Sequence, residues 1–477
     1  MIVPPPIVQI CASFLSAVIL SSCATTAIDV NNDAINRYAT SNIGAPAQWH
    51  KNSREQADAR NLALSLLQKP LASDDAVRLA LALSPAFQAM LSEAAAMSAM
   101  ATQSARLSNP LFTFDRLTRK EGGAVDIDIG RMLSVSILEL INLPSRLRAA
   151  KLMQTSAQLR GISSVVETAS MTRQAWVRAV AAQQSLTYFA QVMDAADASA
   201  ELAKRMYIGG NFSRLQRARQ QVFYADATAQ LAKAKQNALG TREALVRVIG
   251  LDTALAAHLQ LPARLPDLPK LPKAEADIAQ AAINQRIDVQ MAAGDLKLLA
   301  IQYGFTKATS FVNVFHLGGI NNSETGRANQ RGYELELSIP IFDWGDANRG
   351  RAQAQYFAAI ERLRQTTIDA ESNVREQYAG YKTAYELTNH YRDEIVPLRK
   401  IIADEMQLKY NGMLASVFDL LAETRLQINS VILAIDAERD FWLADAALQA
   451  SLLGKPTSGV RMDAMMGMDG GGGGAGH

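Results

Sequence analysis

Two segments of the chain alternate regularly between apolar and polar residues. In residues 333–341 every odd position is apolar, and residues 125–137 follow the same pattern with one interruption at Arg131. Such alternation is typical of a β-strand with one face in water and the other in an apolar environment. Each run is about as long as the 9–11 residues that a tilted membrane strand requires. We therefore predict a β-hairpin within residues 110–141 and a second one within residues 309–343.

The positions of the prolines predict long helices between these hairpins. Proline is absent from residues 145–261 and from residues 341–396. Because proline is costly inside a helix, these gaps favour unbroken helices, and the residues there include many good helix formers such as Ala, Gln, Leu and Arg. We expect long helices over about 146–208 and 349–410, each followed by a turn and a returning helix.

The same parts occur twice in the same order. Residues 133–139 recur in similar form at 337–343, an offset of 204. The chain is therefore interpreted as a duplicated half-molecule, with a first repeat over 73–261 and a second over 274–455. A proline-rich linker, 262–273, separates the two copies. The predicted fold class is mainly α with a membrane β-barrel, built from a duplicated unit of helix, β-hairpin and long helical hairpin.

The strand count predicts an oligomer. Two hairpins supply four strands, whereas single-chain membrane barrels start at eight, and lipid cannot satisfy the edges of an open sheet. Closure therefore needs at least two chains, and three chains would give twelve strands. A hairpin of a soluble β-sandwich is the alternative interpretation of either segment alone. The long flanking helices of both copies disfavour this alternative.

The N-terminus has the pattern of a targeting signal. Residues 7–20 form an apolar stretch that is too short to span a bilayer but fits a secretory signal. Small residues precede Cys23, as in the lipobox of bacterial lipoproteins, whose cysteine becomes the lipidated first residue. We expect a lipoprotein signal peptide over 1–22, a lipid such as palmitate on Cys23, and an N-terminal lipidated linker segment over 23–72. Ala24 is compatible with sorting to the outer membrane, and a chance cysteine is the alternative.

Composition and motifs exclude several classes of function. The 48 basic and 46 acidic residues leave a net charge of +2, which gives no electrostatic footprint for a nucleic-acid binder. Two cysteines exclude a disulfide scaffold, and five scattered histidines predict no metal site. We find no phosphate-binding loop, metalloprotease motif or serine-hydrolase motif. We therefore expect neither an enzyme nor a cofactor, apart from the covalent lipid on Cys23.

The duplicated order of parts resembles the TolC-like outer-membrane efflux factors. Specific similarities lie at residues 107–110, at 245–250 and at 337–345, and the resemblance covers about 73–455. It implies a homotrimer with a 12-strand β-barrel in the outer membrane and a 12-helix α-barrel extending into the periplasm. The implied partners are a periplasmic adaptor (a membrane fusion protein) and an inner-membrane pump. The implied function is passive conduction of substrates from the periplasm to the exterior.

The resemblance also implies where the adaptor docks. It places the periplasmic tips of the two helical hairpins at residues 207–216 and 410–419. The tip residues expected to contact the adaptor are Gly209, Gly210, Gly412 and Met413.

The resemblance implies a gate at the same tips. In the family, an aspartate nine residues after the tip aromatic lines the gate, and Tyr410 is followed at this spacing by Asp419. The first copy has Gln216 at the corresponding position, and the second gate aspartate of the family falls on Ala422. We therefore expect a gate of Asp419, Gln216 and Tyr410 that is less acidic and less cation-selective. A solvated helix cap is the alternative interpretation of Asp419.

Two features bear on the cargo. Residues 410–421 look similar to family members linked to copper or other heavy-metal efflux. Residues 456–477 form a Gly/Met-rich tail with four methionines and His477, and thioether and imidazole groups suit soft metals. A disordered low-complexity tail with no metal role is the alternative.

A different class of protein also shares several of these features. A periplasmic adaptor or a structural coiled-coil lipoprotein would have a lipid anchor and helical hairpins too. Such a protein would lack two alternating hairpins of membrane length, so we keep it as the alternative function.

Overall fold

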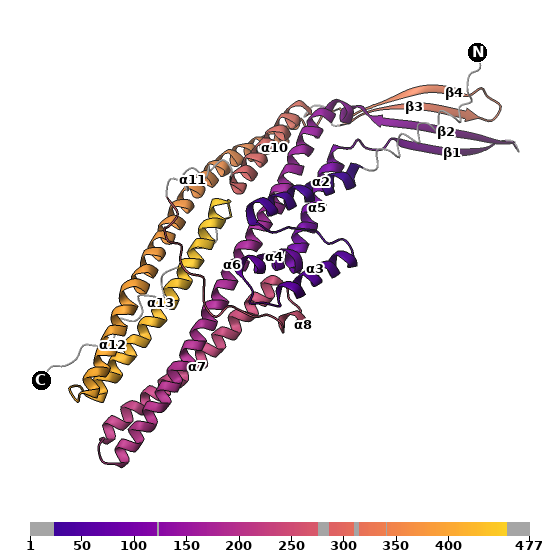
Figure 1. Cartoon of the computed structure of the whole chain (residues 1–477). Helices are drawn as coiled ribbons and strands as arrows, with labels where there is room; N and C mark the ends of the chain where they lie inside the picture. Colours follow the sequence, from indigo (N-terminus) through magenta and orange to yellow (C-terminus); the bar gives the residue numbers. More distant parts are fainter. Residues whose placement is uncertain (1–22, 122–123, 275–285, 310–313, 340, 456–477) are drawn as a thin grey trace. The chain divides into compact units, whose positions relative to one another are not determined.

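The computed structural model describes residues 23–121, 124–274, 286–309, 314–339 and 341–455 (Figure 1). The expected signal peptide, 1–22, and the expected tail, 456–477, lie outside the described residues. The predicted fold class is confirmed, because the described chain is mainly helical and contains one small sheet.

The helices and strands follow one another in two similar series. The α-helices are α2 (Cys23–Tyr38), α3 (Ser53–Leu66), α4 (Ser73–Leu83), α5 (Pro85–Ala105), α6 (Ile137–Ile208), α7 (Arg214–Ile249), α8 (Thr253–Ala256), α10 (Ile287–Thr309), α11 (Asp346–His390), α12 (Val396–Asn411) and α13 (Val417–Leu452). Two short π-helical turns are η2 (Ala39–Ile43) and η4 (Tyr391–Ile395), and the strands are β1 (Leu111–Glu121), β2 (Ala124–Ser136), β3 (Phe315–Glu324) and β4 (Gln330–Leu337). Each β-hairpin is preceded by a helix and followed by a long helical hairpin.

The chain divides into two compact units. The first unit comprises Met1–Ile35, Leu91–Gly161 and Asp288–Ile368, and it contains the sheet. The second unit comprises Asn36–Met90, Ile162–Ile287 and Asp369–His477, and it contains the far ends of both helical hairpins.

The sheet of the first unit joins the two repeats. Its four strands are antiparallel in the order β1-β2-β3-β4, so the central pair, β2 and β3, comes from different halves of the chain. In the part of the chain that the structure describes, β1 and β4 each have a neighbouring strand on one side only. The sheet therefore has two open edges in a single chain.

The second β-hairpin ends earlier than the alternation predicts. β4 stops at Leu337, whereas the apolar–polar pattern continues to residue 341. The sequence explains this difference, because Pro340 has no amide hydrogen to donate to a strand ladder.

The second unit is organised around a buried tryptophan of α6. The Trp176 side chain is 3% exposed, and its Nε1–H donates a hydrogen bond to the Leu71 carbonyl at 2.7 Å. Leu71, Leu245 and Ile249 are fully buried in the same cluster. Trp176 therefore ties the middle of α6 to the segment before α4 and to the end of α7.

The segment expected as a linker, 23–72, is instead folded. It contains α2, η2 and α3, and Ala63, Leu67 and Leu71 are buried in the core of the second unit. Within α3 the buried residues are Ala59 and Ala63, which lie one turn apart, so α3 buries one face.

The second long helix is interrupted, unlike the first. We expected one helix over 349–410, but α11 ends at His390, η4 inserts one π-helical turn, and α12 begins at Val396. Pro397 lies in the first turn of α12, where its missing amide hydrogen costs little. A wider turn next to a proline makes this point a local irregularity in the second hairpin.

Among the described residues, no single helix is long and apolar enough to cross a membrane. The helices α4 and α5 meet the length and composition requirement only when they are taken together. The chain bends by 55° between them.

Candidate functional site at the tips of the helical hairpins

The first hairpin turns between α6 and α7 through a short hydrogen-bonded loop. The backbone N–H groups of Gly209, Gly210 and Asn211 donate at 2.9–3.1 Å to carbonyls of the last turn of α6. Gly210 has a φ of +75°, which favours glycine because other residues have a Cβ that crowds the backbone there. The sequence Gly209-Gly210 therefore allows the chain to reverse directly after the helix.

The second hairpin repeats this turn 203 residues later. The N–H groups of Gly412, Met413 and Leu414 donate at 2.8–3.0 Å to carbonyls of the last turn of α12. Met413, which corresponds to Gly210, has a φ of +61° and a side chain that is 93% exposed. A left-handed conformation costs a non-glycine residue about 1–2 kcal/mol, so the second tip is strained where the first is not.

Both returning helices begin with a capping box. In α7 the Ser213 hydroxyl accepts from the Gln216 N–H at 3.2 Å, and the Gln216 side chain accepts from the Ser213 N–H at 2.6 Å. In α13 the Ser416 hydroxyl accepts from the Asp419 N–H at 3.2 Å, and the Asp419 carboxylate accepts from the Ser416 N–H at 3.1 Å. The two predicted gate positions, Gln216 and Asp419, therefore occupy the third position of equivalent helices.

The environment of Asp419 favours its charged form. Its carboxylate accepts a second hydrogen bond, from the Ser416 hydroxyl at 2.7 Å. The bonds from the Ser416 hydroxyl and from the Ser416 N–H lower the pKa of the Asp419 carboxyl below its ordinary value. The helix N-terminus stabilises the same negative charge. Within one chain Asp419 therefore caps α13, as the alternative interpretation expected, and its carboxylate is exposed.

The two tips contact each other through aromatic side chains. The rings of Phe212 and Phe418 lie 5.5 Å apart between centroids, at an interplanar angle of 32°. Beside them is an apolar cavity of about 210 Å³, lined by Ala198, Ser199, Leu202, Ala203, Phe212, Gln220, Tyr410, Val417, Leu420 and Leu421. Tyr410 is half-buried in this contact, whereas its counterpart Tyr207 is exposed and lies under the Arg217 guanidinium, 5.1 Å from the ring centroid.

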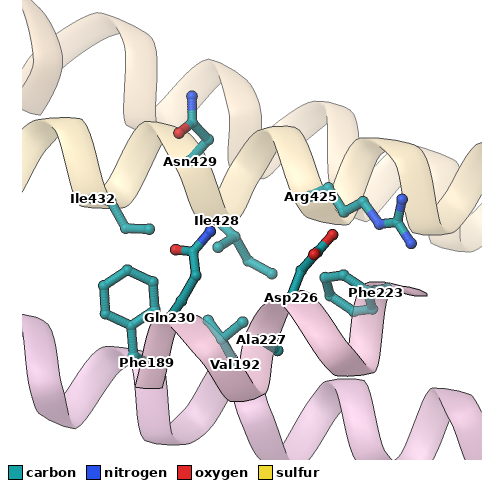
Figure 2. Close-up of a pocket in the computed structure, with 10 residues that line it drawn as sticks. All are labelled: Phe189, Val192, Phe223, Asp226, Ala227, Gln230, Arg425, Ile428, Asn429 and Ile432. Atoms are coloured by element: carbon teal, nitrogen blue, oxygen red, sulfur yellow. The ribbon is translucent and has the colours of Figure 1, made fainter. Parts of the chain in front are cut away.

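A second contact between the hairpins lies farther from the tips (Figure 2). It surrounds a cavity of about 220 Å³, with Phe189 and Val192 of α6 on one side and Ile428 of α13 on the other. Figure 2 shows Arg425 of α13 beside Phe223 of α7, and its guanidinium lies 4.3 Å from the centroid of that ring. The two hairpins are therefore held together by apolar and cation–π contacts at this level.

The structure places the tip residues that the sequence singled out in the two turns and in the first turns of the two returning helices. Gly209, Gly210, Gly412 and Met413 shape the turns, and Gln216 and Asp419 cap the helices. Cys23 is the first residue of α2 and is not part of the tips. No cluster of three His, Cys, Asp or Glu side chains suited to a metal ion occurs among the described residues.

Sequence reasoning did not find the contact between Phe212 and Phe418. The motif Ser-x-x-Gln at 213–216 was a visible signal for a helix start, and its counterpart at 416–419 has Asp in the last position. The aromatic contact had no comparable signal, because it joins residues about 200 positions apart.

The sequence of the second repeat matches a known protein family. Residues 274–452 match the outer membrane efflux protein family. The matched segment contains Tyr410, Gly412, Met413 and Asp419. The first repeat lies outside the matched segment, although it has the same order of elements.

Solved outer-membrane channels have the same fold over most of the chain. The outer-membrane channel OprN superposes with a TM-score of 0.68 at 17% identity, covering 86% of this chain and 93% of the channel. The Campylobacter jejuni CmeC outer membrane channel gives 0.66 at 17% identity, with coverages of 86% and 89%. The open state of the Neisseria gonorrhoeae MtrE outer membrane channel gives 0.66 at 17% identity, with coverages of 82% and 91%. No curated protein matches the chain by sequence.

Proposed function

We propose that this protein is the outer-membrane channel component of a tripartite efflux system. It would conduct substrates passively from the periplasm to the exterior, as a homotrimer with a lipid on Cys23. The observation that carries the proposal is the fold: a small sheet and two long helical hairpins in the arrangement of solved outer-membrane channels. The family match of the second repeat supports the same conclusion.

The open edges of the sheet support an oligomer. Unpaired N–H and C=O groups along β1 and β4 are costly in lipid, where no water can satisfy them. Three copies of the four-stranded sheet would pair all edges in a twelve-stranded barrel. One face of the sheet also exposes large apolar side chains in the single chain, as expected of a surface that faces lipid: Phe112, Phe114, Val125, Leu133, Val135, Leu317, Tyr333, Leu335 and Leu337.

The tips support a role as the gate and as the adaptor-docking surface. Asp419 is exposed and charged, so three copies would place a ring of carboxylates near the end of the tube, while Gln216 would add no charge. The turn residues Gly412 and Met413 leave the tip accessible, and Met413 is almost fully exposed. An apolar, exposed turn of this kind suits a periplasmic adaptor as the partner, with an inner-membrane pump supplying the energy.

Copper-type metals are the cargo class that we propose. The support is the sequence of the second tip and the methionines and His477 of residues 456–477, since thioether and imidazole ligands suit Cu(I). Isothermal titration of the full chain and of a chain ending at residue 455 with Cu(I) tests the tail. Equal binding by both proteins would remove the tail from the proposal.

The channel function is tested in membranes and in bilayers. We expect the protein in the outer-membrane fraction, chemical crosslinking to a trimer, and ion conductance after reconstitution in planar lipid bilayers. A Cys23→Ser variant should lose the lipid but keep the trimer. Release of the wild-type protein by carbonate extraction, together with no conductance, would instead support the alternative of an adaptor or structural lipoprotein.

A further inference from the structure

The linker between the repeats is fastened to both helices of the second hairpin close to one acidic residue. Glu438 lies half-buried in the middle of α13. One turn farther along the helix, the Trp442 Nε1–H donates to the Pro266 carbonyl at 3.1 Å. The Tyr385 hydroxyl of α11 donates to the Lys270 carbonyl at 3.0 Å. The linker segment 262–273 is thus bonded to α11, and to α13 one turn away from Glu438.

Gln184 of α6 connects the same linker to Glu438. Its side-chain oxygen accepts from the Leu265 N–H at 3.4 Å, and its amide donates to the Glu438 carboxyl. Leu265 is 1% exposed, so this part of the linker is buried between the two hairpins. Four elements therefore meet at Glu438: α6, the linker, η4 and α13.

Charged groups face Glu438 from the linker and from η4. The linker contributes Arg264 and Asp267, whose side chains are largely exposed and pair with each other at 3.4 Å. η4 contributes Arg392, which is bonded to Asp393 at 2.8 and 2.9 Å.

The other charges near Glu438 on its own helix are paired among themselves. Arg439 binds Asp436 at 2.5 Å and Asp440 at 2.9 Å. The charged form of Glu438 is therefore stabilised by Arg264 and Arg392, and it is destabilised by Asp267 and by the loss of hydration on burial.

Burial has the largest effect among these influences. It raises the pKa of the Glu438 carboxyl to about 7, against the lowering effects of Arg264, Gln184 and Arg392. A carboxyl group with this pKa changes its charge near neutral pH, where an exposed glutamate is fully ionised.

The neighbouring backbone offers a hinge. η4, Tyr391–Ile395, contains no buried residue, and it joins α11 to the proline-containing first turn of α12. Single π-helical turns within helices frequently mark functional sites, because the wider turn weakens the regular hydrogen-bond ladder. Movement at η4 would separate Arg392 from α13.

We propose that protonation of Glu438 closes the junction between the inter-repeat linker, η4 and α13, and that its ionisation loosens this junction. A neutral Glu438 is compatible with its half-buried position beside the linker. The carboxylate, after releasing its proton to water, is better solvated when the linker or η4 moves away. This device goes beyond the proposed channel function, and it makes the second hairpin more mobile above neutral pH than below it.

The sign of the pH dependence follows from linkage. Opening exposes Glu438 and returns its pKa toward 4.5, so the open state binds fewer protons than the closed state between these two pKa values. The junction is therefore most stable at low pH and loses stability as the pH rises through about 7. Between pH 6 and pH 8 the protection of the junction against opening should fall about tenfold.

Hydrogen–deuterium exchange of the full chain tests the device. Protection factors, corrected for the intrinsic effect of pH on exchange, are measured for peptides that cover the linker 262–273 and η4. We expect a fall of about tenfold from pH 6 to pH 8 in the wild type and no such fall in Glu438→Gln. Glu386→Gln, at an exposed position of α11, is the matched control and should keep the wild-type profile.

Two further variants keep the test decisive. His390 pairs with Glu394 at 3.0 Å next to η4, so His390→Gln tests whether this pair contributes, and it must keep the fall in protection. Arg392→Gln removes a cation that stabilises the carboxylate, so the midpoint of the fall should move to higher pH. A wild-type profile in Glu438→Gln, a flat profile in His390→Gln, or a midpoint in Arg392→Gln that is unchanged or lower would each overturn the proposal.

Discussion

The two hairpin tips have the same backbone but different chemistry. Three hydrogen bonds of the same type close each turn, and a Ser N-cap starts each returning helix. The left-handed position, however, is Gly210 in the first tip and Met413 in the second. The third position of the capping box is neutral in the first tip, at Gln216, and acidic in the second, at Asp419.

The tips also differ in net charge, and the second tip is again the more acidic one. Residues 201–219 contain five basic residues and one acidic residue, whereas the equivalent residues 404–422 contain one basic and three acidic residues. The duplicated turn therefore does not require a particular side-chain charge, because its hydrogen bonds come from the backbone and from one serine. This difference shows that equivalent positions in the two repeats differ in charge while the turn keeps the same backbone hydrogen bonds.

Removing the contact between the two tips should have the largest effect on their stability. Phe212 is 9% exposed and packs against Phe418, so Phe212→Ala should destabilise both tips by about 2 kcal/mol, since a buried aromatic side chain leaves a cavity. Hydrogen exchange of peptides from the two turns should become about thirtyfold faster.

The control for this contact is a neighbouring apolar residue on the surface. Leu215 is 63% exposed, so Leu215→Ala should leave exchange in both turns almost unchanged. Faster exchange in the first turn alone after Phe212→Ala would show that the tips open independently.

Substitutions at the left-handed position should change the stability of the turns by a smaller amount. The first turn should lose stability and the second should gain it. No atom lies within 4 Å of a Cβ placed on Gly210, so Gly210→Ala adds only the backbone strain, about 1 kcal/mol. Met413→Gly should relieve strain and stabilise the second turn by about 0.5 kcal/mol, because the greater freedom of glycine in the unfolded chain offsets part of the gain. Hydrogen exchange of each turn measures both changes, and a destabilising Met413→Gly would contradict the account of strain.

The charge at the capping position should affect conduction more than stability. In the reconstituted trimer we expect Asp419→Ala to raise single-channel conductance, because it removes both the charge and the cap. Ser416→Ala removes the hydroxyl of the cap, at a cost of about 1 kcal/mol, but keeps the carboxylate. If Ser416→Ala raised conductance as much as Asp419→Ala, the cap and not the charge would control the gate.

The first tip supplies the reciprocal variant. Gln216→Glu adds a carboxylate at the equivalent position without removing a cap, since glutamate also serves as the third residue of a capping box. We expect increased preference for cations over anions in this variant, measured as a reversal potential. An unchanged potential would place Gln216 outside the conduction path.

The sequence predicted those elements that a pattern within one continuous stretch of residues indicates. Alternation located both β-hairpins, and the prolines indicated the long helices. The repeat offset of 203 placed Gln216 and Asp419 at equivalent positions.

Contacts between distant segments were not predictable in the same way. Phe212 meets Phe418, and Gln184 meets both Leu265 and Glu438, through packing that depends on how two helical hairpins lie together. The folded segment 23–72 was missed because its buried residues are mostly alanines and leucines. Such residues give no signal of a partner until the rest of the core is known.

The stability contributed by the two capping boxes should depend differently on pH, and this is the smallest of the expected effects. Hydrogen bonds from Ser416 lower the pKa of Asp419 below its ordinary value of 3.8, so its contribution to the second tip is complete above that value. The contribution is lost as the pH falls through the lowered pKa. Gln216 does not titrate, and the first cap should be independent of pH. Hydrogen exchange of both turns in one sample should therefore show protection falling in the second turn alone as the pH drops below 3.8. A parallel fall in both turns would mean that acid loosens the contact between the tips before it protonates the cap.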